Sequence, residues 1–269
     1  MLFSVRLLIK TVIETFYITG MIILIGLFLG ILRTNSIKNI QRSFGSNVVM
    51  ITAVIGVPIH ELSHAIFAIL FGHKVNDIKL FQKPDENGVM GYVDHSYNKR
   101  NIYQQIGNFF IGIAPIFGGA ISIITLMYFL VPKSYNQFIH ILIKSINVTT
   151  LNEKNIVGIL STYGELIKNI FSPQNLNNPS FYIFLFVAIA ISSHMSLSYA
   201  DIKGASKGLI AIFLVLLLIN VFNLSKYLVT IQILRYNILL TGIMIVAVFL
   251  SIIAFVVSLF LLLLRRKLI

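Results

Sequence analysis

The chain contains no cysteine. This absence excludes disulfide bonds, thiolate nucleophiles and cysteine ligands for a metal ion. Charged residues are also scarce, since they make up 11% of the 269 residues. A soluble domain usually has about 25%. Hydrophobic residues reach 57% and the mean hydropathy is +0.89. This composition argues against a soluble globular protein and indicates an integral membrane protein.

Long apolar runs show where the chain is expected to cross the bilayer. A transmembrane helix needs about 20 mostly apolar residues. The runs that meet this length are 11–32, 48–71, 107–131, 181–200, 206–223 and 236–264. We therefore predict an all-α polytopic membrane protein with about six transmembrane helices. We expect residues 1–269 to form a single integral membrane domain.

Basic residues outnumber acidic ones, and the net charge is +12. Most of these lysines and arginines fall between the apolar runs, where they set topology and contact lipid headgroups. We therefore expect the lipid bilayer as a partner, and no nucleic acid. The bias of Lys and Arg between alternate loops favours two cytoplasmic termini. The expected location is a bacterial cell membrane, with a multi-pass topology.

The second apolar run contains the sequence HELSH, in which His60 and His64 flank Glu61. Histidines four residues apart lie on one face of a helix, one turn apart, so that both imidazoles can bind one metal ion. This H-E-x-x-H pattern is typical of zinc metalloproteases, in which the glutamate acts as a general base. The alternative is a hydrogen-bonded polar cluster. Because ionisable groups inside a membrane are costly, we favour the metal site.

A catalytic zinc site usually has three protein ligands and an open position. With no cysteine, the third ligand must come from His, Asp or Glu. Asp201 lies at the end of the polar sequence ISSHMSLSYAD, and topology places it at the depth of the histidines. His194 competes for this role, although it lies about 10 Å away along a helix. Asp201 could instead cap a helix that begins near Lys203.

These residues resemble the site-2 protease family of intramembrane zinc metalloproteases. The resemblance implies that His60 and His64 bind the metal, that Glu61 is catalytic, and that Asp201 belongs to a later Asp-Gly motif. In this chain, Ile202 replaces the glycine of that motif. The similarity extends over about residues 48–205, the expected metalloprotease core.

A second family motif, Gly-Pro-x-x-Asn, resembles the sequence IAPIFGG at 113–119. Here Ala114 precedes Pro115, and Gly118 stands in place of the asparagine. The resemblance implies that Pro115 and Gly118 contact the substrate. His95 is a further candidate, because it could stabilise an oxyanion; the alternative is an ordinary surface histidine.

The segment between the second and third runs predicts a β-hairpin. The strand-like sequences KVNDIKLF and VMGYVDHS flank KPDENG, and Asn87-Gly88 is a strong turn signal. The edge of such a hairpin could hold an extended peptide, or the hairpin could simply cover the surface. Segment 132–180 predicts two amphipathic helices, near 135–147 and 154–171, at the membrane periphery.

The predicted function is an intramembrane zinc metalloprotease that hydrolyses peptide bonds of membrane-embedded or membrane-proximal substrates. The expected partner is a membrane protein or peptide. One alternative is a membrane metal transporter, which would not need a carboxylate that binds no metal beside the histidines. Another is an inactive protease-like protein that binds membrane partners.

Overall fold

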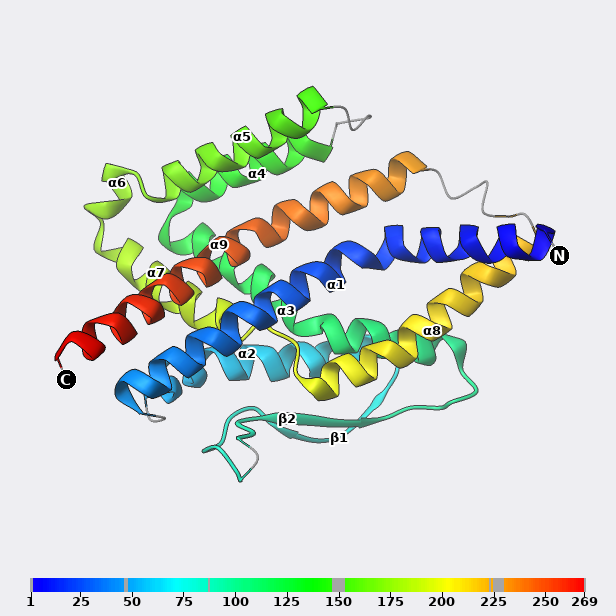
Figure 1. The fold of residues 1–269 in the computed structure, drawn as a ribbon, viewed down its shortest axis with the longest axis horizontal. Coiled ribbons are helices and arrows are strands. Elements are labelled where there is room, and N and C mark those ends of the chain that lie inside the picture. Colours follow the sequence, from blue (N-terminus) through cyan, green and yellow to red (C-terminus); the bar gives the residue numbers. More distant parts are fainter. Residues whose placement is uncertain are drawn as a thin grey trace.

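The computed structural model describes residues 2–45, 48–86, 88–146, 153–222, 224 and 230–268. These residues form a helical bundle with one small sheet (Figure 1). In chain order the elements are α1 (Leu2–Phe44), α2 (Val49–Leu70), β1 (Lys74–Lys79), β2 (Tyr92–Ser96), α3 (Ile102–Leu130), α4 (Pro132–Ile146), α5 (Glu153–Ile170), α6 (Pro173–Leu176), α7 (Pro179–Ser192), α8 (Tyr199–Val221) and α9 (Thr230–Leu268). The prediction of an all-α polytopic protein with a hairpin between its second and third long helices is confirmed.

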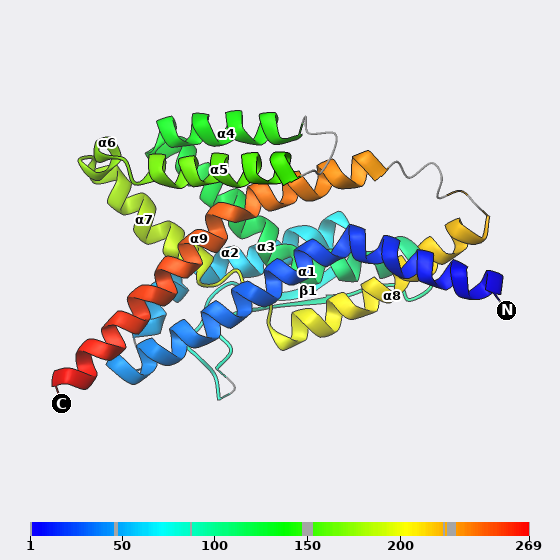
Figure 2. The same cartoon turned by 45° about the horizontal axis from the view of Figure 1, so that its top comes forward.

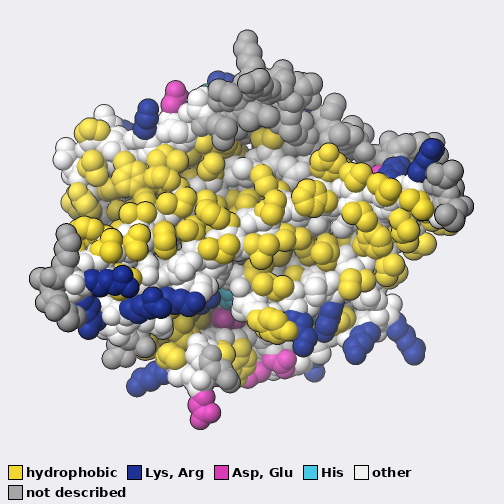
Figure 3. Space-filling view, viewed as in Figure 1, with side chains coloured by type: hydrophobic (Ala, Val, Ile, Leu, Met, Phe, Trp, Pro, Cys, Tyr) yellow, Lys and Arg dark blue, Asp and Glu magenta, His cyan; other side chains and the backbone are white. Residues whose placement is uncertain are grey.

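Within the described ranges, five helices are long and apolar enough to cross a membrane: α1, α2, α3, α8 and α9. Many of their large apolar side chains face outward, for example Phe16, Ile31 and Ile210. Figure 3 shows these side chains as a broad hydrophobic band, with Lys and Arg gathered along its lower edge. Apolar surface of this extent is suited to lipid rather than water. The chain is an integral membrane protein.

The predicted fourth span, 181–200, is wrong as a continuous helix. Helix α7 has only 14 residues and ends at Ser192. Residues 193–198 are not helical, and α8 begins at Tyr199. The chain breaks here because the Ser198 side chain caps α8 by accepting a hydrogen bond from the Asp201 amide. Asp201 therefore lies in the first turn of α8 and not at the end of the preceding helix.

The hairpin follows α2 through a glycine turn. Gly72 has a φ of +71°, a left-handed conformation that glycine adopts without steric cost. The His73 amide donates to the Ala68 carbonyl (2.8 Å), which ends the helix. Strands β1 and β2 then pair antiparallel, with an irregularity between Val75 and Asp77. At the far end the Gly88 amide donates to the Asp85 carbonyl (2.9 Å), and Asn87 lies outside the described residues.

The two amphipathic helices predicted in segment 132–180 are confirmed as α4 and α5. Figures 1 and 2 show them side by side, across the bundle from the hairpin. They bury Phe138, Ile141, Leu166 and Ile170 in a core that continues into α3, α7 and α9. Helix α3 packs against both α2 and α8. This packing brings the motif on α2 and the first turn of α8 together.

Candidate metal centre

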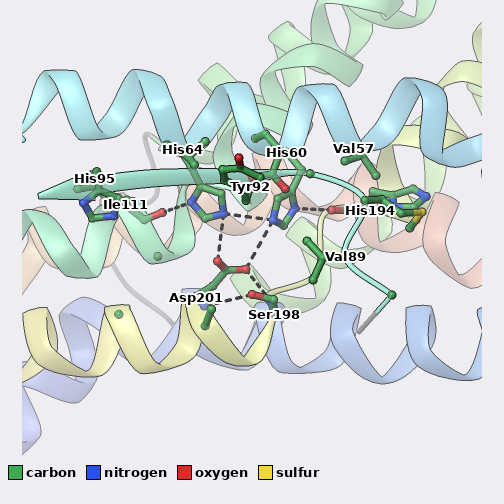
Figure 4. Close-up of a pocket in the computed structure, with 18 of the residues that line it drawn as sticks. Val57, His60, His64, Val89, Tyr92, His95, Ile111, His194, Ser198 and Asp201 are labelled. Atoms are coloured by element: carbon green, nitrogen blue, oxygen red, sulfur yellow. Dashed lines mark hydrogen bonds and ion pairs between the residues drawn. The ribbon is translucent and has the colours of Figure 1, made fainter. Parts of the chain in front are cut away.

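The two histidines of the motif lie on one face of α2, as their spacing predicts. Their ring centroids are 4.8 Å apart and the rings meet edge to face, at 72°. The two Nε2 atoms are 3.1 Å apart. Figure 4 shows both rings pointing from α2 toward Asp201 on α8. The motif therefore presents two nitrogen atoms to one point between the helices.

Backbone carbonyls orient both rings. The Nδ1 atom of His60 lies 2.8 Å from the His194 carbonyl oxygen, and that of His64 lies 2.8 Å from the Ile111 carbonyl oxygen. A carbonyl oxygen can only accept a hydrogen bond, so in each ring Nδ1 carries the proton. In the neutral form each Nε2 then presents a lone pair. This is the arrangement by which a metal-binding histidine is held in place.

Asp201 supplies the third group. Its Oδ1 atom is 3.1 Å from the Nε2 of His64, and its Oδ2 atom is 3.5 Å from the Nε2 of His60. Oδ2 also accepts a hydrogen bond from the Ser198 amide (2.6 Å), which completes a capping box at the start of α8. The two interpretations of Asp201, metal ligand or helix cap, are therefore compatible in one residue.

The donor set fits a zinc ion. One ligand atom from each of His60, His64 and Asp201 lies within 4.8 Å of the others. Two neutral imidazole lone pairs and a carboxylate repel one another unless a proton or a metal ion lies between them. Zinc binds imidazole nitrogen at about 2.0–2.1 Å in a tetrahedral site, which holds two such nitrogens about 3.3 Å apart. The 3.1 Å between the Nε2 atoms is close to this value.

A cavity of about 540 Å³ opens beside these three residues. Its wall includes Glu61, which is only 8% exposed. The turn and strand β2 of the hairpin cover one side, and Gly91 comes so close that a Cβ atom there would lie 2.8 Å from the Cγ of Glu61. Figure 4 shows Val89 and Tyr92 on this side. The cavity is large enough for a short extended segment of a peptide.

The other residues predicted for the site differ in whether they line the cavity. His194 lines the cavity, but its Nε2 atom lies 3.3 Å from the Thr52 hydroxyl oxygen, and it contacts the candidate ligands through its backbone carbonyl, which faces His60. Pro115 is buried inside α3 and does not line the cavity. A Cβ atom on Gly118 would overlap the Ser63 hydroxyl, which shows that Gly118 packs α3 against α2. His95 does line the cavity.

His95 belongs to a second pair of histidines, outside the membrane-spanning helices. Its Nδ1 lies 3.0 Å from the Nδ1 of His73, and the Nε2 of His73 donates to the Gln104 carbonyl oxygen (2.8 Å). Burial lowers the pKa of His73, and burial together with the neighbouring His73 and His64 lowers the pKa of His95. The neutral His95 ring therefore has its proton on Nδ1, and its Nε2 is an acceptor, which disfavours the predicted contact with an oxyanion.

Several cavity residues were not predicted from the sequence. Asn108 of α3 and Arg33 of α1 both line the cavity. The carbonyls of Ile111 and His194 orient the histidines. The break before α8 did have a signal, because Ser198-x-x-Asp201 fits the capping-box pattern.

A match to a protein family identifies the class of protein in which this centre occurs. The family model described as Peptidase M50B-like matches residues 21–201, two thirds of the chain. The chain belongs to the M50B-like peptidase family. The match starts within α1 and ends at Asp201, so it includes all three candidate ligands and Glu61. No curated protein and no solved structure shows a significant match. M50 peptidases are membrane-bound zinc metalloproteases, which agrees with the resemblance to site-2 proteases.

Proposed function

We propose that the protein is an intramembrane zinc metalloprotease that cleaves membrane-embedded or membrane-proximal peptides. The observation that carries this proposal is the convergence of two imidazole nitrogens and a carboxylate at the wall of a cavity. The family membership supports the same function. His60, His64 and Asp201 are the proposed ligands. A zinc ion held there supplies a Lewis acid that polarises the scissile carbonyl and makes a water molecule more acidic.

Glu61 is the proposed proton carrier. It lies next to His60 on α2 and lines the cavity, and it is not part of the ligand group. Its carboxylate takes a proton from the attacking water and then delivers the proton to the nitrogen of the leaving amine. Residues of α2, α3 and the hairpin form the cavity wall around this carboxylate. The substrate must be extended there, because a helical peptide bond is shielded by its own hydrogen bonds.

The first test compares the zinc content and the peptidase activity of the wild type with those of Glu61→Gln. Purified wild type is expected to carry about one zinc per chain, by elemental analysis. Glu61→Gln is expected to keep the zinc and to lose hydrolysis of a pool of single-span peptides in proteoliposomes, read by mass spectrometry. Glu165→Gln, on the exposed side of α5, is the control and should remain active.

Three outcomes of this test would contradict the proposal. Protein never exposed to chelator that contains no transition metal would remove the metal centre. A Glu61→Gln variant that cleaves peptides as fast as wild type would remove Glu61 from the proton transfer. Zinc retained together with metal flux across the liposome membrane, and with no cleavage, would favour a transporter instead.

A further inference from the structure

Arg33 is a cation inside the bundle that the proposed mechanism does not use. It lies within α1, a helix that is long and apolar enough to cross a membrane, just after the apolar run that ends at residue 32. Its side chain lines the same cavity as His60, Glu61 and Asp201. The Nε atom is buried and has no hydrogen-bond partner. Arg33 forms no hydrogen bond or ion pair with any residue that the structure describes.

The acidic residue that interacts with Arg33 already has other partners. Asp201 interacts with Arg33 electrostatically. However, its Oδ1 faces His64, and its Oδ2 faces His60 and the Ser198 amide. A charged side chain within a membrane protein normally pairs or lines a functional pathway. A guanidinium that lacks a partner in a cavity wall therefore indicates that its partner is a ligand.

We propose that Arg33 binds a carboxylate of the peptide that occupies this cavity, and so selects substrates with an acidic group near the cleaved bond. The proposal rests on the proposed proteolytic function and deepens it. A guanidinium presents five N–H donors in a planar fork that matches a carboxylate with two parallel hydrogen bonds. In the same cavity Glu61 repels an anion, whereas a zinc ion at His60, His64 and Asp201 attracts one, so the dependence of binding on Arg33 is what distinguishes the two positions.

Two sources can supply this carboxylate: an Asp or Glu side chain, or the free C-terminus of a peptide. Binding is measured by fluorescence anisotropy with zinc-loaded Glu61→Gln protein in detergent micelles, so that the peptides are not consumed. The probes are short fluorescent Ala/Leu peptides with one Asp or Asn at successive positions. Each is made with a free and with an amidated C-terminus, which separates the two sources.

The expected result is that one carboxylate position strengthens binding about tenfold over its amide analogue, as for a hydrogen bond to a charged group. Adding Arg33→Gln should reduce this preference to less than about twofold, and Arg33→Lys should restore part of it, because lysine keeps the charge without the fork. Lys38→Gln is the matched control. It removes an exposed cation from the same helix that does not line the cavity, and the preference should remain.

Thermal unfolding separates this role from a structural one. Because Arg33 has no partner, Arg33→Gln should leave the unfolding midpoint unchanged or raise it by about 2–4 °C. A lowered midpoint would indicate a structural cation. Equal binding of acid and amide peptides, or a preference that persists in Arg33→Gln, would overturn the proposal.

The proposed function can fail separately from this inference. If wild type cleaves no peptide while Glu61→Gln shows the Arg33-dependent preference, the proteolytic function fails and the carboxylate site stands. If wild type cleaves peptides and Arg33→Gln slows every peptide equally without changing the preference, Arg33 acts on the reacting carbonyl and the inference is wrong.

Discussion

At the scale of single residues, Asp201 has two tasks in one carboxylate. Its Oδ2 atom closes the capping box with Ser198, and both oxygen atoms face the histidines of α2. The capping box at the start of α8 and the proposed third ligand therefore share one side chain. A variant that keeps the cap and loses the charge can separate these tasks.

Asp201→Asn is that variant. Its amide oxygen can still accept from the Ser198 amide, so we expect unfolding free energy to change by less than about 1 kcal/mol. Zinc affinity should fall by at least about 10–100-fold, because a neutral amide replaces the anionic ligand. Both are measured by denaturant unfolding and by competition with a zinc chelator dye.

Ser198→Ala gives the opposite pattern. Losing the cap should cost about 1 kcal/mol of stability and leave most of the zinc in place. Zinc affinity equal to wild type in Asp201→Asn would remove Asp201 from the ligand set.

Residue by residue, the sequence identifies the three residues that come together at the candidate metal centre better than it identifies the groups around them. Helical spacing identifies His60 and His64, and the polarity of the fourth run identifies Asp201. The carbonyls of Ile111 and His194 have no signature, because every residue has a carbonyl. The predicted first span ends at residue 32, so the sequence places Arg33 in the loop that follows. The polar sequence after Arg33 lowers the hydropathy, and yet α1 continues to Phe44.

At the scale of elements, the position of α8 against α3 depends on Gly112. A Cβ atom there would lie 2.6 Å from the Asp201 carbonyl oxygen and 2.7 Å from the Cβ of Ala205. Gly112→Ala should therefore displace the first turn of α8, cost about 1–3 kcal/mol and weaken zinc binding without touching a ligand.

Gly204→Ala is the matched control for this prediction. Gly204 lies on α8 and has open space where a Cβ would be. Alanine there should stabilise the helix by about 0.5–1 kcal/mol. Thermal unfolding and chelator competition compare the two variants. Equal behaviour of both would show that the close approach of α3 and α8 does not position Asp201.

The hairpin should become less stable in acid. The pKa values of His73 and His95 are both lowered, by burial first, so the folded hairpin favours neutral rings. Their contribution to stability is complete above about pH 6.5, the pKa of unfolded histidine, and is lost as pH falls toward the lowered values. The Asp94 carboxylate opposes this loss only in part, by raising the pKa of His95.

Hydrogen exchange of the amides in β1 and β2, corrected for intrinsic rates, measures the stability of the hairpin as a function of pH. Protection should decrease between about pH 7 and pH 5.5, and His73→Gln should reduce the dependence. His140→Gln, an exposed histidine on α4, should leave it unchanged. Constant protection over this range would show that the histidine pair does not hold the hairpin.

At the scale of the whole molecule, the number of crossings changes the expected topology. Two cytoplasmic termini require an even number of crossings, whereas five of the described helices can span the membrane. The shorter α7 and the break before α8 account for the difference. Figures 1 and 2 show the start of α1 and the end of α9 at opposite ends of the bundle. An odd number of crossings places the start of α1 and the end of α9 on opposite sides of the membrane.

Single cysteines in this cysteine-free chain test the topology. Ser4→Cys and Lys83→Cys, at the start of α1 and near the hairpin turn, should react with an impermeant maleimide from the same side. Arg266→Cys, near the end of α9, should react from the other side; all three positions are exposed. Labelling of all three from one side would restore the prediction of two cytoplasmic termini.

The two groups that orient the histidine rings are backbone carbonyls, and this has a consequence for mutagenesis. A missense mutation at Ile111 or His194 changes a side chain and leaves the carbonyl in place. A screen of random substitutions for loss of function should therefore recover His60, His64 and Asp201 through their own side-chain atoms, and Ile111 and His194 only through the packing of their buried side chains. Only insertions, deletions or prolines that shift the backbone of α3 or of the segment before α8 would reveal the two carbonyls.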